Sequence, residues 1–241
     1  MNALSPVASA GLTDRGLQRE MNEDGFLCEP ELGLFAVADG LGGLPRGEFA
    51  SRLALDELLR LVRALPRDAA PDWQEIFEQI NRVVLAAGRE ISETLGIGTT
   101  LTVVRALPGR LILGHVGDSG LFAFPAGGKA AQLTRDHTMA QEMLDAHGPS
   151  IADSIPENYH HTLTQCIGQP VKFVVETRSI PVSAGTRYLL YSDGVTKTQE
   201  LPELAGITFF TTTPVALVSK VVELANSRGG PDNVTAVALF Y

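Results

Sequence analysis

The sequence is poor in cysteine and in basic residues, and it has no long apolar run. Its two cysteines, Cys28 and Cys166, are too few for a disulfide framework. Residues 1–10 lack the basic start and the apolar run of a secretory leader, so we expect both thiols to be reduced. The 19 Lys and Arg against 28 Asp and Glu leave a net charge of -9, which argues against nucleic acid as a partner. With no segment near the roughly 18 apolar residues of a membrane helix, we predict a cytoplasmic protein without a membrane span.

The rest of the composition is that of an ordinary globular protein. Hydrophobic residues fill 44% of the 241 positions, which is enough for a substantial core. No Pro/Gly/Ser-rich linker, charge run or internal repeat divides the chain. We therefore predict one domain over residues 1–241.

Hydrophobic patterns predict short strands separated by a few helices. The helices are expected at 48–62, 73–95 and about 214–226. The order of elements lacks the regular strand-helix alternation of a doubly wound parallel sheet, which favours a layered α+β sandwich. The predicted strands are rich in β-branched or large apolar residues and lie at 34–38, 99–105, 110–116, 171–177, 187–191 and 233–240.

Aspartates follow three of the predicted strands, each beside a glycine. Asp39 and Asp193 precede a glycine, Asp118 follows one, and Asp232 lies in the glycine-containing turn 229–233. One Asp-Gly pair usually marks only a turn, but strand ends are also where rigid scaffolds present functional groups. Two carboxylates ~4 Å apart repel by about 4 kcal/mol at an effective dielectric of about 20, so a convergence of four would require divalent cations. Oxygen ligands select Mg²⁺, Mn²⁺ or Ca²⁺ over zinc.

Seven short motifs occur in an order that is more specific than any one of them. They are REMNED at 19–24, VADGLGG at 37–43, GTT at 98–100, GDS at 117–119, LTRDHT at 133–138, SDG at 192–194 and GPDN at 230–233. In this order they resemble the type 2C family of metal-dependent protein phosphatases, over about nine tenths of the chain.

The resemblance implies a fold, an activity and partners. The fold would be α+β, a four-layer α-β-β-α sandwich in which two central, mostly antiparallel sheets are flanked by helices. The activity would be hydrolysis of phosphoserine and phosphothreonine in protein substrates, by direct attack of a hydroxide that bridges two Mn²⁺ or Mg²⁺ ions. Domains of this length resemble the bacterial members that oppose a Ser/Thr kinase, so a cognate kinase is an implied partner.

The resemblance also assigns the two central metals. Asp39 would bridge them, and the Gly40 carbonyl would bind one of them. Asp193 and Asp232 would complete the coordination sphere of the first metal. A glycine at such a turn lets a main-chain carbonyl join a carboxylate as a ligand.

An outer set of residues completes the implied site. Glu23 and Asp24 would hold the second metal largely through water, and Asp118 with Asp193 would form a third metal site. Arg19 would bind the substrate phosphate, because a guanidinium fork contacts two phosphate oxygens at once. Residues expected to fix a carboxylate or a turn are Asn233, Thr99 and Ser192.

The proton donor departs from the family pattern. Many members carry a histidine at one of the positions that are Leu41 and Leu44 here, and neither leucine can protonate a leaving alkoxide. A water on the metal cluster or a histidine from elsewhere would have to serve. The segment 136–164 resembles the family's flap over the active site, and its His160 and His161 are the best local source of an acid.

Two more positions differ from the family. Gly120 replaces an arginine, which would change either a structural ion pair or the field near the third metal. The segment 197–199, beginning with Lys197, is also atypical, and we expect it to alter surface recognition rather than chemistry.

Two other functions remain open from the sequence alone. A metal-dependent hydrolase of small phosphoesters would use the same carboxylates. A non-catalytic sensor or interaction module would keep the fold without turnover, which the missing histidines favour and the retained carboxylates oppose. The oligomeric state is also open.

Overall fold

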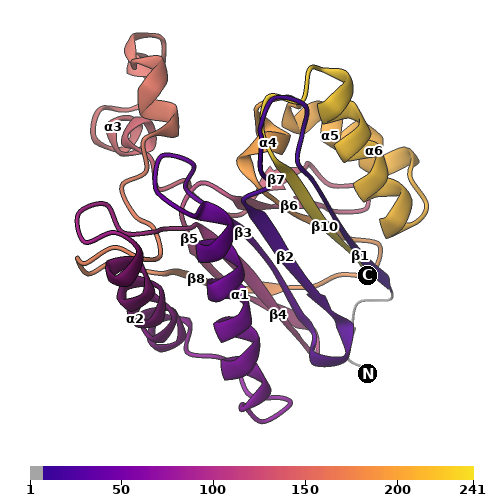
Figure 1. Ribbon diagram of the computed structural model, residues 1–241. Coiled ribbons are helices and arrows are strands. Elements are labelled where there is room, and N and C mark those ends of the chain that lie inside the picture. The colour runs from indigo at the N-terminus through magenta and orange to yellow at the C-terminus, as the bar shows by residue number, and fades with distance from the viewer. Residues whose placement is uncertain (1–7) are drawn as a thin grey trace.

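The computed structural model describes residues 8–241, which form two antiparallel five-stranded sheets (Figure 1). The first sheet has the strand order β2-β3-β4-β5-β8 and the second β1-β10-β9-β6-β7. The strands are β1 Ala8–Asp14, β2 Asp24–Glu29, β3 Leu34–Asp39, β4 Leu101–Leu107, β5 Arg110–Val116, β6 Gly120–Phe124, β7 Ala131–Gln132, β8 Glu176–Pro181, β9 Arg187–Tyr191 and β10 Val234–Phe240. The α-helices are α1 Gly47–Arg63, α2 Trp73–Ile91, α3 Met139–His147, α4 Asp193–Thr196, α5 Leu201–Phe210 and α6 Pro214–Ser227.

Three hydrophobic cores separate four layers. One core lies between α1, α2 and the first sheet, another lies between the second sheet and α5 and α6, and the third joins the two sheets. β3 contributes to two of them: Leu34, Ala36 and Ala38 face the helices, while Phe35 and Val37 face the other sheet. A strand buried on both faces reads as a continuous apolar run, which is why this one was predictable. The predicted four-layer α-β-β-α sandwich is confirmed.

The starts of α2 and α6 follow sequence signals, and the end of α2 does not. Asp72 caps α2 by accepting a hydrogen bond from the Glu75 N–H, and Thr213 caps α6 in the same way. The prediction that the second helix continues to residue 95 was wrong, because α2 ends at Ile91. A Cβ on Gly88 would lie 2.8 Å from the Ile97 nitrogen, so the chain turns back at once to pack on the helix.

The strand predicted at 171–177 was also wrong. The edge strand β8 begins only at Glu176 and pairs with β5. Phe173 and Val175 are buried while Val174 is exposed, which produces the alternation of a strand. Their backbone groups, however, bond to the side chain of Gln74 on α2 instead of to a neighbouring strand.

The segment 136–164 projects away from the two sheets as α3 followed by the short 3-10 helices Pro149–Ser154 and Glu157–His161 (Figure 1). Thr138 caps α3 and forms an isolated bridge with Leu163, so both ends of the segment meet at its base. Among residues 8–241, no helix has the length and apolar character needed to cross a membrane.

Candidate metal centre

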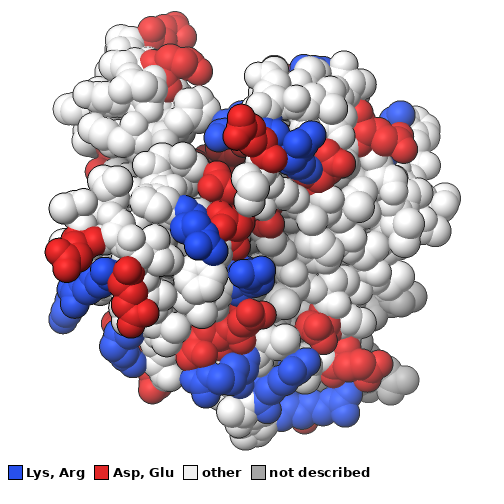
Figure 2. Space-filling model, in the orientation of Figure 1, with Lys and Arg blue, Asp and Glu red and all other residues white. Residues whose placement is uncertain are grey.

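The acidic residues predicted from the sequence meet at one end of the sandwich. There β3, β5 and β9 end, and β2 and β10 begin. Figure 2 shows acidic side chains in the depression between the projecting segment and the α4–α6 helices. A cavity of about 570 Å³ opens here, and its polar lining includes Arg19, Glu23, Asp39, Gly40, Asp118, His161, Asp193, Lys197, Asp232 and Asn233.

The Asp39–Gly40 turn is fixed by its backbone and by two threonines. The Asp39 N–H donates to Thr100 Oγ1 (2.9 Å), and Thr99 Oγ1 donates to the Asp39 carbonyl (2.9 Å). A Cβ on Gly40 would lie 2.2 Å from the Gly47 carbonyl oxygen, so only glycine allows this close approach to α1. The turn therefore presents the Asp39 carboxylate to the cavity from a rigid strand end.

Asp193 and Asp232 are brought together by another close glycine contact. Asp193 begins α4 two residues after the end of β9, and Asp232 lies two residues before β10. A Cβ on Gly194 would fall 1.9 Å from the Asn233 carbonyl oxygen, so this glycine lets α4 pack on the turn before β10. Asn233 holds that turn to the N-terminal loop, donating to the carbonyls of Arg15 and Met21.

Asp24 lies beneath the cavity and does not line it. In the β2–β3 ladder it is the Cα partner of Asp39, and the residue is 9% exposed. Its Oδ2 accepts hydrogen bonds from Ser192 Oγ (2.6 Å) and Thr235 Oγ1 (2.7 Å). Its Oδ1 is buried without a hydrogen-bond partner in residues 8–241. Ser192 therefore holds the Asp24 carboxylate through Oδ2, while Asp24 Oδ1 accepts no hydrogen bond from the described residues.

Burial and mutual repulsion raise the pKa values of three carboxyl groups. Burial, followed by the charge of Asp193, raises the pKa of Asp118 to about 8. Burial also raises the pKa of Asp24 to about 7, against hydrogen bonds that lower it. For Asp39, burial and then the charges of Asp24 and Asp193 place the pKa well above its usual value. Carboxylates crowded in this way are poorly tolerated without cations.

The donor set fits hard divalent cations. It offers carboxylate oxygens and, at Gly40, a turn where a backbone carbonyl can join them, which is the chemistry of Mg²⁺ or Mn²⁺ sites. Besides Asp24 Oδ1, the buried Asp193 Oδ1 has no hydrogen-bond partner in residues 8–241. Such orphaned anionic oxygens cost stability unless something positive contacts them.

Comparison with known proteins agrees with this geometry. Residues 18–227 match the family model described as protein phosphatase 2C. The chain belongs to the protein phosphatase 2C family. It is 33% identical over 242 residues to the serine/threonine protein phosphatase PstP of Mycobacterium tuberculosis, a match that covers 95% of this chain and 44% of that protein. The chain thus spans less than half the length of this relative.

Solved structures match nearly the whole fold. The catalytic domain of PstP in complex with two manganese ions is 31% identical, with a TM-score of 0.78 and 96% of each chain covered. PppA of Pseudomonas aeruginosa, described as a key regulatory component of T6SS, is 29% identical, with a TM-score of 0.85 and coverage of 100% of this chain and 99% of that one.

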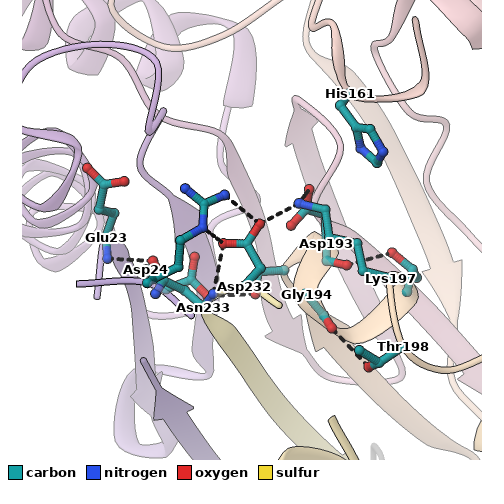
Figure 3. A network of polar contacts seen from close by, with 12 residues as sticks. Glu23, Asp24, His161, Asp193, Gly194, Lys197, Thr198, Asp232 and Asn233 are labelled. Carbon is teal, nitrogen blue, oxygen red and sulfur yellow. Dashed lines mark hydrogen bonds and ion pairs between the residues drawn. The ribbon is translucent and has the colours of Figure 1, made fainter. Parts of the chain in front are cut away.

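Lys197 lines the acidic cavity. Its Nζ lies 2.5 Å from both Asp193 Oδ2 and Asp232 Oδ2, inside the acidic cavity (Figure 3). Arg19 also reaches Asp232, with its Nε 2.8 Å from Oδ1 and its Nη2 2.9 Å from Oδ2. Burial alone would raise the pKa of Asp232, but these two cations lower it. The structure thus places Lys197 among the acidic residues of the cavity, and its effect on recognition or chemistry stays a prediction.

The flap histidines are separated by the structure. His161 lines the main cavity, and Figure 3 shows its ring beside the polar network without a dashed contact to it. A neighbouring cavity of about 610 Å³ is lined by both His160 and His161, together with Asp118 and Asp136. His161 thus faces the main acidic cavity and His160 only the adjacent one. Leu41 and Leu44, the two leucines noted in the sequence, also line the main cavity.

Gly120 has a local explanation that the sequence did not reveal. It pairs with Tyr191 across β6 and β9. A Cβ at this position would lie 2.3 Å from the Tyr191 hydroxyl and 2.7 Å from Thr134 Oγ1. The Tyr191 ring, stacked on Phe122, thus fills the space into which a side chain at position 120 would project.

A second group of potential ligands is formed by His115, His137 and Glu176, of which Glu176 carried no sequence signal. The His115 Nε2 bonds to the Arg135 carbonyl and its Nδ1 to Thr102 Oγ1, while His137 Nδ1 accepts from the Gly117 N–H. Burial lowers the pKa of His115 to about 3, so its ring is neutral. These contacts fix residues 135–137 at the start of the projecting segment, and they already use both nitrogens of His115.

Proposed function

We propose that this chain is a cytoplasmic, metal-dependent protein serine/threonine phosphatase. The observation that carries the proposal is the convergence of Asp39, Asp193 and Asp232 on one open cavity, in a fold shared with serine/threonine phosphatases. The substrates would be phosphorylated proteins, and a Ser/Thr kinase would be the opposing enzyme. The retained carboxylates favour this function over a non-catalytic module.

The proposed metal ligands are the residues expected from the sequence. Asp39 would contact two ions and the Gly40 carbonyl one of them, with Asp193 and Asp232 on the first ion. Two Mn²⁺ or Mg²⁺ ions would supply an activated water and neutralise charge on the phosphoryl group. Glu23, which lines the cavity, and Asp24, which lies beneath it, would orient the waters of the second ion. A third ion would use Asp118 and Asp193.

Arg19 is the proposed phosphate ligand. Its Nε and Nη2 face Asp232, and a Cβ placed on Gly42 would lie 3.0 Å from Nη1, so that nitrogen points toward the 41–43 loop. Asp232 thus positions the guanidinium at the mouth of the cavity. Arg19 Nη1 has no hydrogen-bond partner in residues 8–241 and can donate to a phosphate oxygen.

His161 is the better placed of the two proposed proton donors, because it lines the main cavity and His160 does not. An acid matters for an alkoxide leaving group and much less for nitrophenolate. We expect His161→Gln to lower kcat on a phosphothreonine peptide by about tenfold to a hundredfold and to leave p-nitrophenyl phosphate hydrolysis nearly unchanged. The matched variant His160→Gln should affect neither. An equal loss on both substrates would argue against His161 as the acid.

The reaction class is tested with the purified protein and Mn²⁺. Phosphoserine and phosphothreonine peptides should be hydrolysed, and Asp39→Ala and Asp193→Ala should both abolish turnover while circular dichroism shows a retained fold. Hydrolysis of small phosphoesters without any activity on the peptides would indicate a small-molecule phosphatase. Normal Mn²⁺ binding without turnover of either class would indicate a non-catalytic module.

A further inference from the structure

Lys197 lies between two of the proposed metal ligands. It follows Asp193 by four residues, which is about one helical turn, and its N–H donates to the Asp193 carbonyl at the end of α4. Its Nζ is 2.5 Å from one oxygen of Asp193 and 2.5 Å from one oxygen of Asp232, which is 35 residues further along the chain. The side chain is 24% exposed. The ammonium therefore bridges the two carboxylates at the place where a cation would join them (Figure 3).

The environment strengthens this bridge. Burial alone would lower the pKa of Lys197, but the charges and hydrogen bonds of Asp193 and Asp232 raise it above its usual value. Arg19 contacts both oxygens of Asp232, so this carboxylate is contacted by two cations. An ammonium within hydrogen-bonding distance uses a lone pair on each ligand oxygen and also repels a metal ion of the same sign.

We propose that Lys197 is an internal counter-cation, which competes with the first metal ion for Asp193 and Asp232 and must be displaced when that ion binds. This inference rests on the metal ligands proposed above. The lysine has two opposite effects. It stabilises the folded protein in the absence of metal, and it weakens the affinity of the site for metal, so that occupancy depends on a higher concentration of divalent cation.

The direct test is calorimetric titration of Mn²⁺ into the metal-free protein and its variants at one pH and ionic strength. Lys197→Met removes the charge at similar length, and Lys197→Gln keeps a hydrogen-bond donor without the charge. We expect the tightest Mn²⁺ site of both variants to bind at least about tenfold more strongly than that of the parent. Lys220→Met, which removes an exposed lysine of α6, should bind Mn²⁺ like the parent.

Thermal unfolding gives an independent readout. Without metal, Lys197→Met should melt below the parent, and saturating Mn²⁺ should raise its Tm by more than it raises that of the parent. A variant that folds only in Mn²⁺ also supports the inference. If Lys197→Met does not fold even with Mn²⁺, the affinity of Lys197→Gln decides.

The outcomes separate this inference from the proposed function. Suppose that the parent binds Mn²⁺ and that Lys197→Met and Lys197→Gln bind it more weakly than the parent or within about twofold of the parent's affinity. This result overturns the proposal that Lys197 is a counter-cation and leaves the proposed metal centre intact. A raised KM for phosphopeptide with unchanged metal affinity likewise overturns it and assigns Lys197 to substrate binding. If neither the parent nor the variants bind Mn²⁺, the inference and the proposed metal centre both fail.

Discussion

Asp232 is contacted by two cations, whereas Asp24 and Asp39 form no ion pair within residues 8–241, although all belong to one acidic centre. Arg19 and Lys197 lower the pKa of Asp232 against the effect of burial. Burial and neighbouring carboxylates raise the pKa of Asp39 instead. The negative charge of Asp232 is thus balanced by cations of the chain itself, whereas the charges of Asp24 and Asp39 depend on added cations or protons.

This difference separates two tasks that a metal site must perform. Counter-ions from the chain let the acidic loops fold before any metal binds, because paired carboxylates tolerate burial better than unpaired ones. Carboxylates without counter-ions retain free oxygens and a strong negative potential, which draw in divalent cations. Variants that remove a charge from one part or the other should therefore have opposite effects on the metal-free protein.

The largest expected effect is that of Asp39→Asn. Turnover of a phosphothreonine peptide in Mn²⁺ should fall by about a thousandfold, since the bridging carboxylate is lost. The metal-free variant should nevertheless melt above the parent, because one uncompensated buried charge is removed. Asp56→Asn, at an exposed position of α1, is the matched control and should change neither quantity. If metal-free Asp39→Asn melted below the parent, the Asp39 carboxylate would not be an uncompensated charge.

The sequence predicted the strands and ligands whose signals are local. The runs that became β3, β5, β9 and β10 are apolar because both faces are covered. The turns after β3, β5 and β9 could be recognised from their Asp-Gly or Gly-Asp pairs, and the turn before β10 from its glycines and Asp232. The failed strand at 171–177 has the right alternation, but backbone partners cannot be read from a single segment. The strands β1, β2, β6 and β7 and the helices α3, α4 and α5 were not predicted.

Within the site, the sequence failed where a role depends on two distant segments. The spacing of Asp193 and Lys197 does indicate a helical ion pair, and this signal could have placed the lysine near the site. The second partner, Asp232, becomes a neighbour only because Gly194 lets α4 pack on the turn before β10. Glu176, which lies beside His115 and His137, has no local signal at all.

The next largest effect is the pH dependence of stability without metal. The pKa values of Asp24 and Asp118 are raised to about 7 and about 8, so the folded state binds more protons than the unfolded state between about pH 4 and pH 8. Stability must then decrease as pH rises through this window. We expect the free energy of unfolding to fall by on the order of 3 kcal/mol from about pH 6 to about pH 8.

Denaturant titrations in buffer containing a chelator measure this slope. Saturating Mg²⁺ should flatten it, because a bound cation replaces the protons, and Asp118→Asn should reduce it by removing one titrating group. A metal-free protein that becomes more stable over the same range would show that these carboxylates are compensated in another way.

The smallest effect is expected from Asp232→Asn, and its sign is opposite to that of Asp39→Asn. The amide keeps one oxygen acceptor but loses the charge that holds Arg19 and Lys197, so the metal-free protein should lose about 1–2 kcal/mol of unfolding free energy. Urea unfolding measures this loss. The control Asp56→Asn, measured in parallel, should have an unfolding free energy within about 0.5 kcal/mol of that of the parent. If Asp232→Asn instead stabilised the metal-free protein as Asp39→Asn does, the two cations would not balance this carboxylate. The acidic centre would then carry excess negative charge throughout.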